Sequence, residues 1–186
     1  MFQQIFTLLL DVAGGLLTGA CLLRLYMQRQ RIPFANPVGQ LVFALTDWMI
    51  LPLRKLVPPL GAWDVASLVA ALLVQLLQYL LLALVIGLGV GGWTWLPWLA
   101  VFGLARVALS CMVGLMILYA VISWLQSRSP LTDVIERLVA PVLKPFRRFI
   151  PLVGGIDLSP LAALLVMQVL MIVLGHLQAT VLGAGF

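Results

Sequence analysis

Polar side chains stand inside long apolar stretches of this 186-residue chain, where they could carry chemistry. Five of them are Asp11, Gln75, Arg106, Gln168 and His176. Asp11 and Arg106 should lie at similar depths, roughly 13 to 17 Å along their helices at a rise of 1.5 Å per residue. We hypothesise that they form an ion pair, because an isolated charge in hydrocarbon is costly. A voltage- or proton-coupled site is the alternative role for the two charges.

For the other three of these five residues, the sequence predicts hydrogen bonds rather than catalysis. Gln75 and Gln168 are 93 positions apart. Such amides commonly bond between helices or between subunits, and lining a narrow polar path is the alternative. His176 is the only histidine, and we expect a structural hydrogen bond for it. The chain has no Cys/His metal spacing, no Gly-rich phosphate loop and no nucleophile–base motif, so we predict neither enzyme activity nor a cofactor.

A second set of candidate residues is basic and lies between the apolar stretches. It comprises Arg54 and Lys55 in the first half of the chain and Lys144, Arg147 and Arg148 in the second. Each cation near an anionic lipid surface is worth about 1 kcal/mol, so the set predicts binding of lipid headgroups. Fixing the membrane topology is the alternative role for the same charges.

An aspartate follows each basic pair and precedes the next apolar stretch. Asp64 holds this place in the first half and Asp157 in the second. A carboxylate there suits the N-cap or first turn of a helix, where it faces the positive end of the helix dipole. An Arg–Asp bridge within each half is a further expectation, and a site for a transported ion is the alternative.

These motifs belong to an internal repeat with a constant offset of 93 residues. Eight positions from Pro37 to Leu68 have an identical residue in the second copy, including Leu45, Arg54 and Leu68, and five of the eight are proline, glycine or aspartate. These five are Pro37, Pro52, Pro58, Gly61 and Asp64, matched by Pro130, Pro145, Pro151, Gly154 and Asp157. A repeat of this kind indicates two copies of one structural unit. We therefore divide the chain into residues 1–92 and 93–186.

The composition predicts that both units lie in a membrane. Hydrophobic residues make up 63% of the chain and charged residues 9%, and the mean hydropathy is +1.16. A membrane-spanning helix needs about 20 largely apolar residues. Four stretches meet this length, at about 5–27 and 65–90 in the first unit and about 95–124 and 158–182 in the second.

The distribution of basic residues predicts the orientation. Ten of the eleven lysines and arginines lie in or beside the first and third connections, and the second connection has no charge. The positive-inside rule places both basic connections in the cytoplasm and both termini outside. This rule also accounts for the net charge of +5, so no nucleic-acid partner is expected.

Each basic connection should contain a short amphipathic helix at the cytoplasmic leaflet. The start signals are Asn36-Pro37 and Ser129-Pro130, an N-cap residue followed by proline at the first helical position. The helices are expected at about 37–51 and 130–143. Pro52 and Pro145 should then stop or bend them, and the later proline and glycine of each copy should reverse the chain.

The doubled pattern of Asn/Ser-Pro, amphipathic helix, Pro-x-Arg-Arg/Lys-x-x-Pro, Gly and Asp resembles the YggT family of bacterial and plastid membrane proteins. The likeness covers nearly the whole chain, and the second copy fits more closely. The resemblance implies a small multi-pass protein of the inner membrane without an assigned catalytic activity. It also implies the roles linked to family members, namely osmotic-stress tolerance, division or nucleoid organisation, and haem maturation of cytochrome b6 in plastids. The last of these roles makes haem ligation the alternative for His176.

The chain is therefore predicted to be an all-α membrane protein with four transmembrane helices, arranged as two parallel hairpin repeats. We expect a scaffold or assembly factor of the bacterial inner membrane whose amphipathic helices bind anionic lipids or a partner. A second copy of the chain or another membrane protein is the expected protein partner. The alternative is a small channel or transporter that serves ion balance under osmotic stress.

Overall fold

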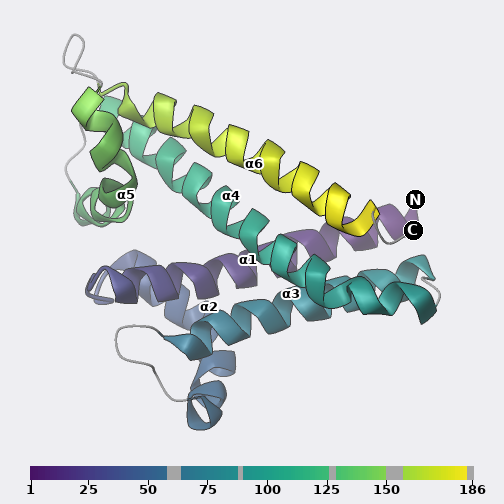
Figure 1. Cartoon of the computed structure of the whole chain (residues 1–186). Coiled ribbons are helices and arrows are strands. Elements are labelled where there is room, and N and C mark those ends of the chain that lie inside the picture. Colours follow the sequence, from purple (N-terminus) through teal and green to yellow (C-terminus); the bar gives the residue numbers. More distant parts are fainter. Residues whose placement is uncertain (58–63, 88–89, 126–128, 150–156, 184–186) are drawn as a thin grey trace.

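The computed structural model describes residues 1–57, 64–87, 90–125, 129–149 and 157–183, and these residues are helical apart from short connections (Figure 1). The helices are α1 (Phe2–Arg29), α2 (Pro37–Leu56), α3 (Val65–Ile86), the 3₁₀ helix η1 (Val90–Trp95), α4 (Leu96–Leu125), α5 (Pro130–Phe149) and α6 (Ser159–Gly183). The described ranges contain no strand.

Four of these helices are long and apolar enough to cross a bilayer. The spans are Gln3–Arg29, Val65–Ile86, Trp93–Ser123 and Ser159–Val181. Between 17% and 28% of the most apolar window in each span is buried inside the protein, so most of their side chains are left to face lipid. This confirms the predicted all-α membrane fold with four spans.

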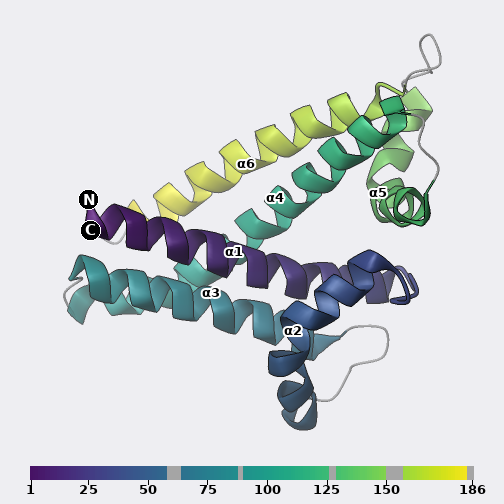
Figure 2. The same ribbon diagram turned by 180° about the vertical axis from the view of Figure 1, so that it is seen from behind.

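The two halves of the chain pair their helices in the same way. In the first half α1 packs against α3 and α2, and in the second α4 packs against α6 and α5. The termini and the α3–α4 connection lie at one end of the molecule, and α2 and α5 lie at the other (Figures 1 and 2). The halves meet through α3, α1 and α4 near the terminal end and diverge toward the end that holds α2 and α5.

Both short helices start as predicted, with the same cap at matched positions. The Asn36 side chain accepts a hydrogen bond from the Gly39 backbone nitrogen at 2.9 Å. The Ser129 hydroxyl accepts one from the Thr132 nitrogen at 3.2 Å. These caps satisfy backbone donors that have no partner within the first helical turn.

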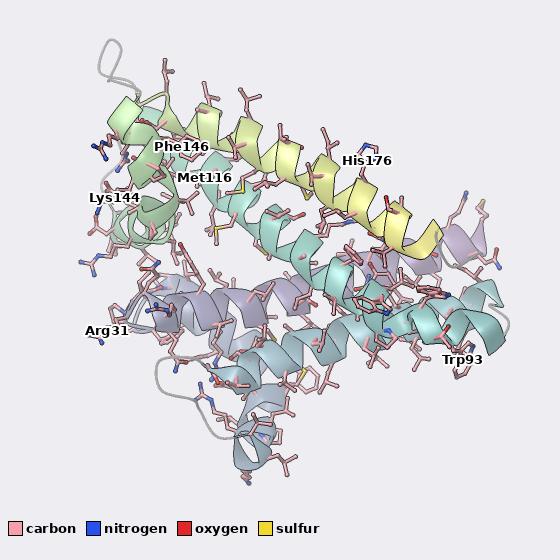
Figure 3. All side chains as sticks on the ribbon, viewed as in Figure 1. Arg31, Trp93, Met116, Lys144, Phe146 and His176 are labelled. Carbon is pink, nitrogen blue, oxygen red and sulfur yellow. The ribbon has the colours of Figure 1, made fainter. Side chains whose placement is uncertain are left out.

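The prediction that Pro52 and Pro145 end these helices is wrong. Both prolines lie inside helices that continue to Leu56 and Phe149, and α2 changes direction along its length in Figure 2. An internal proline removes one backbone hydrogen bond, and packing beyond it offsets that loss. Leu53 and Phe146, one residue after each proline, pack against buried clusters. Figure 3 shows Phe146 beside Met116 of α4.

The buried face of α5 also differs from expectation. Val134, Ile135, Leu138, Val139 and Leu143 are at most 8% exposed, and they belong to two clusters formed with other helices. The Tyr26 hydroxyl of α1 donates to the Leu138 carbonyl at 2.9 Å. The apolar face of α5 is therefore covered by protein from both halves, and does not lie on the leaflet.

The helix α2 keeps an exposed apolar side. Leu41, Trp48 and Leu51 are 60%, 65% and 53% exposed, and their spacing places them on one side of a helix. Among the spans, the second ends at Ile86 rather than near residue 90, since Gly87 has a left-handed φ of 73° that ends the helix. The turns predicted at Pro58, Gly61, Pro151 and Gly154 lie outside the described residues.

Candidate functional site

Each repeat contains an ion pair between the end of its short helix and the start of its second span. Arg54 Nη2 lies 2.5 Å from Asp64 Oδ2, and Arg147 Nε lies 2.9 Å from Asp157 Oδ2. The two pairs are offset by the repeat length of 93 residues. We call them the repeat clamps. They confirm the Arg–Asp bridge expected within each half.

The first clamp is the more deeply buried. The Asp64 side chain is 1% exposed and that of Arg54 36%. Ser67 Oγ also donates to Asp64 Oδ2, at 2.7 Å. Burial disfavours the charged form of Asp64, but the hydrogen bonds from Arg54 and Ser67, with the charge of Arg54, outweigh it and lower the pKa of this carboxyl. Asp64 occupies the N-cap position of α3 without a side-chain capping bond, because its carboxylate is turned to these partners.

The second clamp combines the bridge with a first-turn role. Asp157 Oδ1 accepts a hydrogen bond from the Ser159 backbone nitrogen at 2.9 Å. Burial again opposes ionisation, and the bonds from Ser159 and Arg147 outweigh it and lower the pKa of Asp157. The Arg147 guanidinium also donates to the Tyr119 hydroxyl, and its carbon lies 5.5 Å from the centre of that ring.

The clamps divide the predicted headgroup-binding set. Arg54 and Arg147 are paired with aspartates, whereas Lys55, Lys144 and Arg148 are exposed and form no ion pair within the described residues. Figure 3 shows Lys144 at the end of the molecule that holds α2 and α5. Lys144 and Arg148 lie close together on α5, whereas Lys55 lies on α2.

The predicted ion pair between Asp11 and Arg106 is not formed. Asp11 Oδ1 accepts from Gln78 Nε2 at 2.8 Å, and Arg106 Nη2 donates to Gln178 Oε1 at 2.8 Å. Asp11 is met by α3, the closest neighbour of α1, while Arg106 is turned toward α6. Each charge therefore takes an amide partner on the helix against which its own helix packs.

The two repeat-matched glutamines have different surroundings. Gln75 is 2% exposed, and its amide donates to Thr18 Oγ1 at 3.1 Å and to Gln78 Oε1 at 3.0 Å. Gln168 is exposed on α6, so the two amides do not bond across a common axis. The positions matching Thr18 and Gln78 are Cys111 and Met171, which explains why the second half has no equivalent network.

His176 also lies on the outer surface of α6 (Figure 3). Its backbone carbonyl accepts a hydrogen bond from the Thr180 hydroxyl at 2.9 Å. Within the described ranges its imidazole has no hydrogen bond, so the structural bond predicted for this side chain is not found in them.

Arg24 is a buried charge that the sequence interpretation missed. It is 2% exposed, and its Nη1 lies 2.8 Å from Thr46 Oγ1 and 2.6 Å from Asp47 Oδ1. Its guanidinium carbon stands 4.6 Å from the centre of the Phe43 ring. An aspartate within a largely apolar helix needs a partner, and Asp47 was the signal for this pair.

The comparisons with known proteins agree with this architecture. The family model CCB3/YggT matches residues 3–85 and again residues 98–178. The two matched segments correspond to the two halves of the structure. The chain belongs to the CCB3/YggT family.

Its relatives extend across the same length. The YggT protein of Escherichia coli K12 is 37% identical over 181 residues, covering 94% of this chain and 92% of the relative. A protein of Pseudomonas aeruginosa is 34% identical over 176 residues, covering 92% and 89%. Both are described as uncharacterized, so they bring no activity to this YggT-family protein. No solved structure matches the chain.

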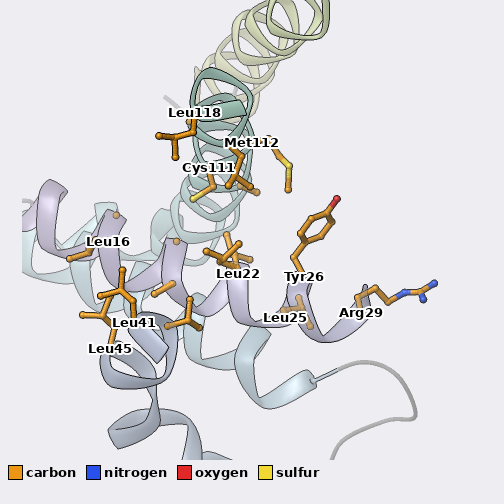
Figure 4. A pocket seen from close by; sticks show the side chains of 18 residues that line it. Leu16, Leu22, Leu25, Tyr26, Arg29, Leu41, Leu45, Cys111, Met112 and Leu118 are labelled. Atoms are coloured by element: carbon orange, nitrogen blue, oxygen red, sulfur yellow. The ribbon is translucent and has the colours of Figure 1, made fainter. Parts of the chain in front are cut away.

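The divergence of the two halves leaves an apolar crevice in this YggT-family protein. It has a volume of about 490 Å³ and lies between α1, α2 and α4 (Figure 4). Leucine, glycine and alanine make up most of its lining, with Tyr26 and Arg29 at the end of α1. A lining of this kind offers contacts to hydrocarbon and few groups for catalysis.

Proposed function

We propose that this YggT-family protein is a non-enzymatic scaffold of the bacterial inner membrane that gathers anionic lipid headgroups at its cytoplasmic face. In this proposal the termini are outside and the end that holds α2 and α5 faces the cytoplasm. The distribution of charge supports this orientation, because the basic residues of α2 and α5 lie at that end.

The observation that carries the proposal is that the two short helices expose different kinds of side chain. The helix α2 presents Leu41, Trp48 and Leu51 outward, whereas α5 buries its apolar face and presents cations. Arg137, Lys144 and Arg148 are exposed, at a spacing of seven and then four residues that places them on one side of α5. We call these three residues the α5 cationic face.

The repeat clamps support this division of roles. Arg147 lies between Lys144 and Arg148 in the sequence, and its bridge to Asp157 ties the end of α5 to the start of α6. The α5 cationic face is thus held on a helix that is packed on one side and bridged at its end. A preorganised set of cations loses less conformational entropy on binding than a flexible one, and each contributes about 1 kcal/mol near an anionic surface.

Energy transfer from the tryptophans to dansyl-labelled lipid tests the proposal. The protein is reconstituted into vesicles of phosphatidylcholine and phosphatidylglycerol, with either lipid carrying the label. Wild-type protein should show more transfer to labelled phosphatidylglycerol, and the Lys144→Gln/Arg148→Gln double variant should lose this preference. The matched control is Arg31→Gln/Lys55→Gln, which removes two exposed cations outside the α5 cationic face. Equal losses in the two double variants would contradict the proposal.

A second candidate function, a pathway for a small solute, is supported by a different observation. Two cavities of about 480 and 540 Å³, toward the end of the molecule that holds the termini, share Asp11 in their linings. A flux assay with the purified protein in liposomes tests this candidate. Flux that is lost in an Arg106→Gln variant would favour it over the scaffold.

A further inference from the structure

Six polar residues of the spans line one cavity between α1, α3 and α4. Its volume is about 480 Å³. The polar residues that line it are Asp11 from α1, Gln75, Gln78 and Tyr79 from α3, and Arg106 and Ser110 from α4. Polar groups converging at this depth are expensive to maintain in a bilayer and usually serve a function.

Two glycines make room for the amides of this cavity. A Cβ on Gly103 of α4 would overlap Gln75 Oε1 and stand 2.6 Å from the Tyr79 ring carbon Cε2. A Cβ on Gly14 of α1 would overlap Gln78 Oε1 and stand 2.6 Å from its Cδ. The backbones of α1 and α4 therefore press directly against the two glutamines of α3. This packing holds the amides in place and keeps the polar groups gathered.

A neighbouring cavity lies toward the terminal end of the molecule. This second cavity, of about 540 Å³, is lined by Gln3, Gln4, Thr7, Leu8, Asp11 and Ile86. Asp11 lines both cavities. Farther along α1, Thr18 is fully buried, and Cys21, Ala70 and Ala71 form an apolar cluster. The polar groups thus extend inward from the terminal end, and an apolar cluster lies beyond them.

The charges of the cavity indicate the class of ligand. The Asp11 carboxylate and the Arg106 guanidinium both line it, but each bonds to a glutamine instead of to the other. A carboxylate and a guanidinium retain further acceptor and donor positions after one hydrogen bond. A lone ion would add a net charge to this pair in a region of low dielectric constant. A molecule with both an ammonium and a carboxylate group adds two charge-assisted hydrogen bonds and no net charge.

We infer that this cavity binds a small zwitterionic solute that enters from the terminal end, with its ammonium group at Asp11 and its carboxylate at Arg106. The inference goes beyond the scaffold function, because the cavity lies in the half of the molecule opposite to the α5 cationic face. It gives the solute-pathway candidate a substrate class, and binding can be measured whether or not any flux occurs.

Calorimetry on the wild-type protein in lipid nanodiscs tests the inference without a variant. The probes are the ω-amino acids glycine, 4-aminobutyrate and 6-aminohexanoate, which separate the two charges by increasing distances. Acetate and methylammonium each carry one of the two charges. At least one ω-amino acid should bind saturably, at concentrations where acetate and methylammonium do not. Binding of methylammonium or acetate as tight as that of every ω-amino acid would overturn the inference, as would the absence of saturable binding by all three.

Variants then assign the two ends of the ligand. Asp11→Asn and Arg106→Gln should each weaken binding of the preferred ω-amino acid about tenfold or more, since each removes a charge-assisted contact. His176→Gln is the matched control, because His176 lies on the outer surface of α6. Thermal unfolding of each variant identifies those that fold, and the comparison is made among them. Wild-type affinity in both folded charge variants would refute the assignment.

Discussion

Neutralising Asp64 should cost more stability than neutralising its repeat partner Asp157, although the two residues occupy the same place in the sequence pattern. Asp64 is almost fully buried and its carboxylate serves only Arg54 and Ser67. Asp157 also accepts from the Ser159 backbone nitrogen, and asparagine can replace aspartate in such a capping bond. The Asp157→Asn variant therefore keeps one of its two contacts.

The expected magnitudes follow from the exposure of the partners. Removing one member of a fully buried ion pair costs about 3–5 kcal/mol. Because the Arg54 side chain is 36% exposed, water takes over part of its solvation, and we expect about 2 kcal/mol for Asp64→Asn. For Asp157→Asn, with an 11% exposed carboxylate and a retained cap, we expect about 1 kcal/mol or less.

Reversible unfolding in mixed micelles with increasing dodecyl sulfate, followed by the fluorescence of the six tryptophans, measures these free energies. A double-mutant cycle with Arg54→Gln isolates the contribution of the first clamp, and a coupling energy of about 1–2 kcal/mol is expected for residues in direct contact. Additive effects of Asp64→Asn and Arg54→Gln would show that the bridge does not stabilise the fold. A larger loss for Asp157→Asn than for Asp64→Asn would refute the reasoning from burial.

The same assay tests three further expectations. Gln75→Leu should cost about 1–2 kcal/mol of stability, because it leaves buried polar partners unsatisfied. Gln168→Leu changes an exposed residue and should alter stability by less than about 0.5 kcal/mol. Equal effects of the two variants would contradict the different burial of the two glutamines. Asp47→Asn should cost about 2 kcal/mol of stability, because it leaves the buried Arg24 guanidinium without its counter-charge. An unchanged stability would show that Thr46 and the Phe43 ring are enough to stabilise the buried guanidinium. Both clamp carboxylates have folded pKa values below the ordinary 3.8. Their contribution to stability is therefore complete above that value and is lost as the pH falls through the folded pKa. The free energy of unfolding should decrease below about pH 4, and it should decrease less in a variant with both carboxylates neutralised.

Much of the local structure could be predicted because its causes are local. Runs of about 20 apolar residues are sufficient to specify the spans, and Asn36-Pro37 and Ser129-Pro130 specify where the short helices begin. The repeat placed Arg54 and Asp64 at the same positions as Arg147 and Asp157, so an Arg–Asp bridge could be expected within each half. Local rules failed at Pro52 and Pro145, since the packing of the residue after each proline keeps the helix intact.

The partners of the intramembrane polar groups could not be predicted in the same way. The helices α3, α4 and α6 are apolar on nearly all sides, so their sequences do not determine which face turns inward. Equal depth along two helices made Asp11 and Arg106 plausible partners. The rotation of each helix instead brought Gln78 to Asp11 and Gln178 to Arg106.

The sequence on its own determined the number of spans, the doubling of the unit and the positions of the clamp residues, because each depends on segment length, spacing or repetition. Only the tertiary structure decided that the two halves differ in use. The close packing of α1 on α3 buries Gln75, whereas the separation of α6 from the first half leaves Gln168 at the surface. The α5 helix buries its apolar face between the halves, whereas α2 leaves an apolar side exposed. Burial depends on which helix surfaces meet across the whole fold, and identical residues in a repeat therefore acquire different surroundings.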